Sequence, residues 1–237
     1  MRFLRVVVII AVVLGALFVG VDRWAVGYAE NRLADRLQSR QGLAGSAEVE
    51  IHGFPFLTQA IGHELDRVDL KLQGIDAQAD GRKARLTRLD AGFHEVKLNA
   101  DYTGGTARRA EGNALISYED LTKASESGVV LTYGGAPGKV KVTATFDFLG
   151  KSITKSVVST VTLVEGKGGG KLVRVRADSV PGEGLPGIES AIRKRTDFDR
   201  RLDAGLPTGL QLSTLTSDDS GVHLTLSGTD VSLAAGS

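Results

Sequence analysis

The sequence predicts an α+β fold in which an N-terminal apolar helix precedes a long, twisted and mostly antiparallel sheet. Three observations lead to this prediction. Val6–Val21 is an uninterrupted uncharged run, apolar and polar residues then alternate with period two through much of the chain, and only a few short stretches have helical spacing. The 30 glycines against 5 prolines fit many short turns between strands.

The N-terminus has the features of a membrane-targeting segment. The 19 residues from Phe3 to Val21 contain one charge, that of Arg5, and as a helix would span about 28 Å, close to the thickness of the hydrocarbon core of a bilayer. Arg5 can extend its guanidinium to the headgroups. Arg2 and Arg5 favour an orientation with the N-terminus inside and the bulk of the chain outside.

Two interpretations of this segment remain open. Residues 1–23 are a signal anchor that stays attached, or they belong to a signal peptide cleaved after about Ala29, where Gly27-Tyr28-Ala29 offers a small-x-small site. Residues 24–237 show no convincing internal boundary and are expected to form a single domain. Both interpretations place that domain outside the cytoplasmic membrane, either anchored in the cell membrane or secreted into a periplasm-like space.

Composition argues against several classes of protein. The 29 basic and 28 acidic residues give a net charge of +1, and without Arg2 and Arg5 the remaining 27 and 28 give −1. Nucleic-acid-binding proteins usually carry a basic excess, so we expect no nucleic-acid partner. The absence of cysteine excludes disulfides, zinc–thiolate sites and cysteine nucleophiles.

Helices and strands are predicted from these periodicities. Residues 24–41 are rich in helix formers and continue the apolar segment as a helix. Strands are expected around residues 47–52, 65–72, 84–100 (as a pair of strands), 139–163 (a hairpin), 173–177 and 210–228 (a hairpin). Short helices are expected at 117–125, where Ser117 and Asp120 have capping spacing, and within 185–202.

One-sided strands of this kind must cover their apolar face. Two short helices are too small to cover the apolar face of so many strands. The sheet therefore either curls and fills with its own side chains, or it leaves an apolar channel for a ligand.

Catalytic and metal-binding patterns are weak in this chain. Ser220 and His223 lie near Asp218, but the surrounding residues are those of a hairpin turn and no nucleophile elbow is present. The four histidines are scattered without metal-ligand spacing, and the glycine-rich 166–172 lacks the pattern of a phosphate loop. We therefore expect no catalytic residue, no metal and no cofactor.

A basic cluster near residue 195 has two interpretations. Arg193, Lys194 and Arg195 form a cluster with Arg200 and Arg201. Asp197, Asp199 and Asp203 are interleaved with this cluster, which favours a solvated and partly self-paired helix face. The alternative is a membrane-surface patch that faces lipid headgroups.

The stretch 49–75 carries a family resemblance. Here a strand ends in Gly-Phe-Pro-Phe-Leu-Thr-Gln (53–59), Pro55 stops it, and a short helical turn to about Gly62 leads into the next strand. Together with "ALISYEDL" (114–121) and the terminal "GVHLTLSGTDVSL", this resembles the LmeA-like phospholipid-binding family of actinobacterial envelope proteins over roughly residues 20–235. His52 departs from that family's pattern, which more often has a small residue there.

The resemblance implies a non-enzymatic lipid binder with a tubular lipid-binding-like fold, a sheet curled around a helix. The implied partners are a phospholipid or glycolipid and the membrane. The residues expected to bind lipid are apolar strand and bend residues: Val49, Ile51, Phe54, Pro55, Phe56, Leu57, Val68, Leu70, Phe146 and Phe148. The alternative is a non-catalytic envelope scaffold with a fully packed core.

Overall fold

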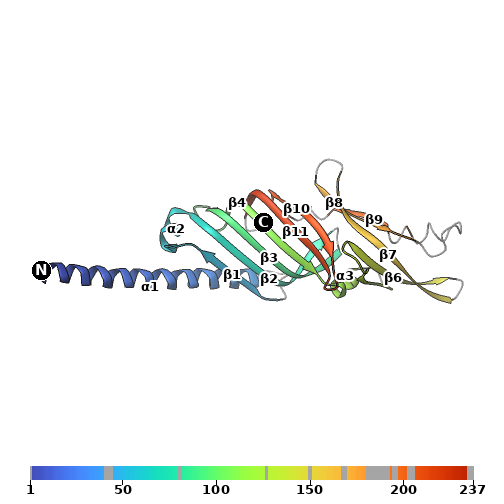
Figure 1. Cartoon of the computed structure of the whole chain (residues 1–237), viewed down its shortest axis with the longest axis horizontal. Coiled ribbons are helices and arrows are strands. Elements are labelled where there is room, and N and C mark those ends of the chain that lie inside the picture. The colour runs from blue at the N-terminus through green and yellow to red at the C-terminus, as the bar shows by residue number, and fades with distance from the viewer. Residues whose placement is uncertain are drawn as a thin grey trace.

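The molecule is elongated, with a projecting helix at one end and two antiparallel sheets along its length (Figure 1). The computed structural model describes residues 2–39, 45–79, 82–125, 128–148, 151–166, 170–179, 193, 197–201 and 206–233. Helix α1 (Arg2–Gln38) extends from one end of the larger sheet, and the smaller sheet lies at the opposite end (Figure 1).

All described strand pairs are antiparallel. The larger sheet has the spatial order β1 (Ala47–His52), β2 (Glu64–Ala79), β3 (Arg82–Leu98), β4 (Gly105–Ile116), β11 (Val222–Ser232) and β10 (Leu210–Ser217). The smaller sheet has the order β5 (Val129–Tyr133), β6 (Lys139–Phe148), β7 (Lys151–Glu165), β8 (Lys171–Ala177) and β9 (Phe198–Arg201). Short helices α2 (Phe56–Gly62) and α3 (Tyr118–Ala124) connect β1 to β2 and β4 to β5. The predicted α+β fold is confirmed.

Helix α1 runs without a break through the apolar segment and the predicted helix that follows it. Every residue of Val6–Val21 is exposed, and the helix is long and apolar enough to cross a membrane. From Asp22 onward one side of the helix packs on the domain. The buried Asp22 carboxylate accepts a hydrogen bond from Leu57 N–H (2.8 Å), and the Glu30 carboxylate accepts one from Ile51 N–H (2.7 Å).

The bend after β1 is determined by its local sequence. Gly53 has φ +110°, a conformation that L-residues rarely adopt, and a Cβ there would lie 2.2 Å from Gln59 Nε2. Pro55, which has no N–H to donate, precedes the first turn of α2, and the Phe54–Pro55 peptide bond is cis. Helix α2 ends at His63, whose left-handed conformation lets its N–H bond the carbonyl oxygen of Ala60.

Two hydrophobic clusters cover different lengths of the larger sheet. The first joins α1 to the sheet and to α2, and its buried members are Val26, Val49, Ile51, Phe56, Leu65, Val96 and Ala107. The second joins the two sheets, and its buried members are Ala114, Val140, Val161, Val173, Val175, Leu212, Val222, Leu224 and Leu226. A hydrogen bond from Ser217 Oγ of β10 to the Lys139 carbonyl of β6 (2.9 Å) reinforces this second contact, and Tyr118 OH of α3 donates to the Asp218 carbonyl (2.9 Å) after β10.

A crease crosses the larger sheet and explains one wrong prediction. Strands β2, β3, β4 and β11 interrupt their alternation at the same level, at Asp66, Glu95, Arg108 and Asp230, and Glu95 and Asp230 have positive φ. Arg108 Nη1 lies 2.8 Å from Glu95 Oε2 on the exposed face. Residues 84–100 were predicted as two strands, but β3 runs through most of them as a single strand. The prediction was wrong because the interruption of the apolar–polar alternation at Glu95 resembles the break that a turn would produce.

Other local predictions had mixed outcomes. The predicted cap is present, since Ser117 Oγ accepts a hydrogen bond from Asp120 N–H at the start of α3. The prediction of a helix within 185–202 is wrong for its C-terminal part, because Phe198–Arg201 forms β9 and pairs with β8. Most of the other residues of this predicted helix lie outside the described residues. Strands β4 and β5 were not predicted. The inner side of β4 is made of alanine and glycine, which have low strand propensity.

The two phenylalanines beside Pro55 are expected to differ in their contribution to stability. Phe56 is 8% exposed and lies in the first cluster, whereas Phe54 is 52% exposed. We expect Phe56→Ala to lower the free energy of unfolding by about 3–5 kcal/mol, and Phe54→Ala to lower it by less than about 1 kcal/mol. Chemical denaturation of both variants tests this, and equal losses would contradict the assigned burial.

Candidate functional site

The inner face of the larger sheet, which is the face that α1 and the smaller sheet cover, is apolar across its full width. Strand register aligns three rows that each take one apolar or glycine residue from all six strands. These rows are Ile51–Val68–Phe93–Ala110–Gly228–Leu210, Val49–Leu70–Ala91–Gly112–Leu226–Leu212 and Ala47–Leu72–Leu89–Ala114–Leu224–Leu215. The inner face is therefore one continuous apolar surface, although its residues are far apart in sequence.

The centre of this surface remains partly exposed. Val68, Leu70, Leu89, Ala91 and Phe93, on neighbouring positions of β2 and β3, are all partly exposed, and we call them the inner-face strip. The strip lies between the two hydrophobic clusters, since Val68, Leu70 and Phe93 border the first and Leu89 borders the second. A contiguous, partly exposed apolar surface in the middle of a six-stranded sheet can contact an apolar ligand.

Strand β4 adjoins the strip with small residues. Ala110 and Gly112 lie across from Phe93 and Ala91 in the register, and both are buried. These positions put little side-chain bulk beside the strip. The sequence prediction missed them because it did not recognise β4 as a strand, and a run of small residues every second position was the signal available.

The structure brings six of the predicted lipid-binding residues together. Val49, Ile51 and Phe56 are buried in the first cluster, and Leu57, Val68 and Leu70 pack against it. Pro55 is partly buried at the bend, whereas the exposed Phe54 ring lies beneath the Arg23 guanidinium, 5.4 Å from it.

The remaining predicted residues lie elsewhere. Phe146 and Phe148 belong to β6 of the smaller sheet, and their side chains lie outside the described part of the structure. Lys194 and Arg195 are also outside the described residues. Arg193 is partly exposed and its Nη1 lies 3.6 Å from Asp197 Oδ2, as expected for a partly self-paired basic cluster.

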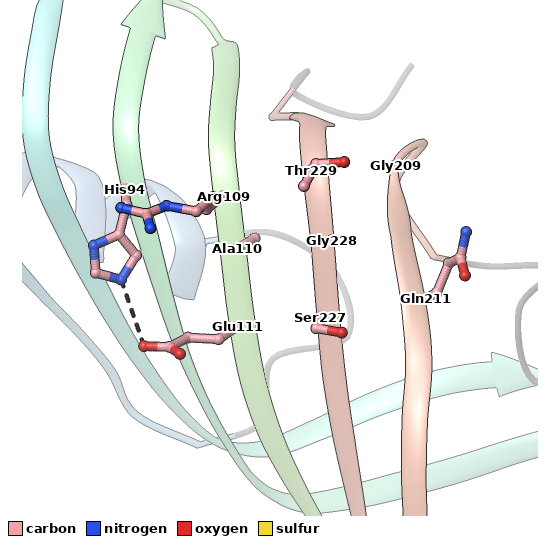
Figure 2. A pocket seen from close by; sticks show the side chains of 9 residues that line it. All are labelled: His94, Arg109, Ala110, Glu111, Gly209, Gln211, Ser227, Gly228 and Thr229. Atoms are coloured by element: carbon pink, nitrogen blue, oxygen red, sulfur yellow. Dashed lines mark hydrogen bonds and ion pairs between the residues drawn. The ribbon is translucent and has the colours of Figure 1, made fainter.

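The opposite face of the same sheet carries a polar groove of about 600 Å³. It is lined by His94, Arg109, Ala110, Glu111, Gly209, Gln211, Ser227, Gly228 and Thr229 (Figure 2). His94 Nε2 lies 3.4 Å from Glu111 Oε1, and Arg109 Nη2 lies 3.5 Å from Glu95 Oε1. In Figure 2 Ala110 points away from the side of β4 that carries Arg109 and Glu111. The groove offers hydrogen-bonding groups but no continuous apolar wall.

A cluster of possible metal ligands lies on the outer face of β1 and β2. Ligand atoms of Glu50, His52 and Asp69 lie within 4.8 Å of one another. Basic side chains already pair with these carboxylates, since Arg67 Nε lies 2.7 Å from Asp69 Oδ1 and Lys71 Nζ lies 3.0 Å from Glu50 Oε1. Burial raises the pKa of Asp69, but the hydrogen bond and charge of Arg67 outweigh it and leave that pKa below its ordinary value. The arrangement is an ion-pair network on a solvated face.

Ser220, His223 and Asp218 meet at the β10–β11 turn without forming a catalytic triad. Asp218 Oδ1 accepts hydrogen bonds from the N–H groups of Ser220 (2.8 Å) and Gly221 (3.3 Å), which is a turn interaction. His223 Nε2 lies 3.1 Å from Ser220 Oγ and 2.9 Å from Asp218 Oδ2. A triad needs the serine and the aspartate on opposite ring nitrogens, and here the same nitrogen contacts both.

Comparison with known proteins gives one match. A family model described as LmeA-like phospholipid-binding matches residues 20–227. No curated protein and no solved structure matches the chain. The matched range begins at the end of the exposed apolar run and includes every described strand apart from the last residues of β11.

The turn cluster is expected to give the protein a measurable response to acid. Hydrogen bonds from Ser220 and His223 hold the pKa of Asp218 at about 2, below its ordinary value of 3.8. A lowered folded-state pKa stabilises the fold above about pH 4, and that stabilisation disappears as the pH falls towards 2. We expect Ser220→Ala to raise the Asp218 pKa in an NMR titration. The stability difference between the variant and the parent should be present at pH 6 and lost at pH 2; an unchanged pKa would contradict the assignment.

Proposed function

The chain belongs to the LmeA-like phospholipid-binding family, and on that premise we propose that it is an extracytoplasmic, membrane-anchored protein that handles phospholipid or glycolipid of the cell envelope without catalysis. The observation that carries the proposal is the inner-face strip. Apolar side chains at the centre of a wide sheet stay partly exposed there, between two regions that α1 and the smaller sheet cover.

The strip has the chemistry that acyl chains require. Each methylene removed from water contributes about 0.8 kcal/mol, so an acyl chain gains affinity from apolar contact alone. Of the residues predicted from the sequence to bind lipid, Val68 and Leu70 are proposed to contact the acyl chain directly. Val49, Ile51 and Phe56 hold the sheet against α1 beside it, and Phe146 and Phe148 are proposed as further contacts at the other end.

The packing of α1 supports a retained anchor over a cleaved signal peptide. Cleavage after Ala29 would remove Asp22 and Val26, which are buried in the domain. Leu57 N–H would lose its acceptor, and a buried donor without a partner costs about 1–3 kcal/mol. We leave Arg193, Lys194 and Arg195 out of this membrane contact, because Arg193 pairs with Asp197 beside β8 of the smaller sheet, at the end of the molecule opposite α1 (Figure 1).

Lipid extraction tests the proposed function. The full chain is purified in detergent, washed, extracted with organic solvent and analysed by mass spectrometry. We expect bound phospholipid or glycolipid in a fixed ratio to protein. Protein that contains no such lipid and takes none up from vesicles would instead support the packed scaffold.

A matched pair of tryptophan substitutions separates lipid on the strip from lipid around α1. Ala91→Trp fills the centre of the strip, whereas Asp90→Trp puts the same side chain on the exposed outer face of β3. We expect Ala91→Trp to lower the lipid-to-protein ratio several-fold and Asp90→Trp to leave it unchanged, with both variants keeping the circular-dichroism spectrum of the parent. Equal lipid content in the two variants would place the lipid elsewhere.

A further inference from the structure

The end of the apolar run Val6–Val21 is joined to the domain by a contact at a defined position along the axis of α1, the hydrogen bond between Asp22 and Leu57. Asp22 follows Val21 directly, so the two lie about 1.5 Å apart along the axis of α1. Asp22 is fully buried, and its Oδ1 accepts a hydrogen bond from the N–H of Leu57 in the first turn of α2. Helix α2 is therefore held at the level where the exposed apolar run ends, at the same end of the domain from which α1 emerges (Figure 1).

Exposed apolar side chains surround α1 at this level. On the domain side, Phe54 is half-exposed, and Ile61 of α2 is 78% exposed. Trp24 and Tyr28 lie on the far side of α1, because each follows a buried residue (Asp22 or Val26) by two positions. They are 71% and 59% exposed, and their ring centroids are 5.8 Å apart. We call Trp24, Tyr28, Phe54 and Ile61 the elbow surface.

We propose that the elbow surface inserts into the interfacial layer of the bilayer that α1 spans, so that the domain rests on the membrane by the α2 bend. The proposal rests on the anchored state proposed above and adds to it the orientation of the domain. Tryptophan and tyrosine are enriched at the membrane interface, where the ring meets the acyl chains and the polar edge stays hydrated. Arg23, over the Phe54 ring, can place its charge among the headgroups while its stem stays apolar.

Continuity with the membrane span identifies the bilayer as the occupant. The elbow surface begins within one helical turn of Val21, so a straight α1 brings it to the interface as soon as Val6–Val21 fills the hydrocarbon core. Four large apolar side chains at that depth are stabilised by burial in lipid and would otherwise face water.

The orientation also connects the membrane to the inner-face strip. Phe56 and Leu57 follow the elbow residue Phe54 and lie in or against the first cluster, which Val68 and Phe93 of the strip also border. A lipid that leaves the bilayer at the elbow therefore meets apolar side chains from the bend to the strip.

Single cysteine labels test the proposal in the full chain, which has no native cysteine. Ile61→Cys reports on the elbow surface. Val130→Cys in β5 is the matched control, because Val130 is an exposed apolar residue (49%) of the smaller sheet. Each variant carries an environment-sensitive fluorophore and is reconstituted into phosphatidylcholine vesicles with spin-labelled lipid, whose nitroxide lies near the headgroup end of the acyl chain.

We expect the nitroxide lipid to quench the label at residue 61 several-fold more than the label at residue 130, and aqueous iodide to show the reverse order. Equal iodide quenching at both sites, in protein that resists carbonate extraction, would overturn the elbow proposal and leave the anchor intact. Shielding from both quenchers would also overturn it, by indicating a protein partner or a second copy at the elbow. Protein that washes off the vesicles would overturn the anchor and the elbow together, whereas lipid on the strip is tested separately by the Ala91→Trp pair.

Discussion

The rest of the structure depends on how the apolar inner face of the larger sheet is covered. Strands of the length of β2 and β3 extend about 50 Å, and every second residue must be kept from water. Helix α1 covers one end of this face and the smaller sheet covers the other. The inner-face strip lies where neither cover is complete, so one packing requirement accounts for both the stability of the domain and its proposed lipid-binding surface.

The crease lets long strands meet this requirement on both of its sides. A one-residue change of phase in a single strand would turn its apolar residues to the solvent. Here four neighbouring strands change phase at the same level, and Arg108 and Glu95 face outward as an ion pair. Phe93 and Val96, on either side of the crease, therefore both face inward, and the sheet keeps one apolar face along its length.

The junction between α1 and the domain contains a hydrogen bond to a fully buried carboxylate, that of Asp22. A buried carboxylate is costly unless its hydrogen bonds are made. Asp22 Oδ1 accepts one from Leu57 N–H, whereas Asp22 Oδ2 is buried without a hydrogen-bond partner among the described residues. Val26 and Glu30 extend the contact along the helix, onto β1. Helix α1 therefore continues from the apolar segment into the packed domain, and the proposed position of α2 at the membrane follows from this contact.

The sequence by itself determined the features that depend on neighbouring residues. The apolar helix, most of the alternating strands, the Ser117 cap and the bend at Pro55 were readable, and Val68 and Leu70 were recognised as apolar strand residues. Only the tertiary structure decided which surfaces meet: β4 places Gly112 beside Ala91, Phe56 is buried while Phe54 is exposed, and Asp22 binds α2. These outcomes depend on strand register and on contacts between distant segments, and the local periodicity of a chain does not encode them.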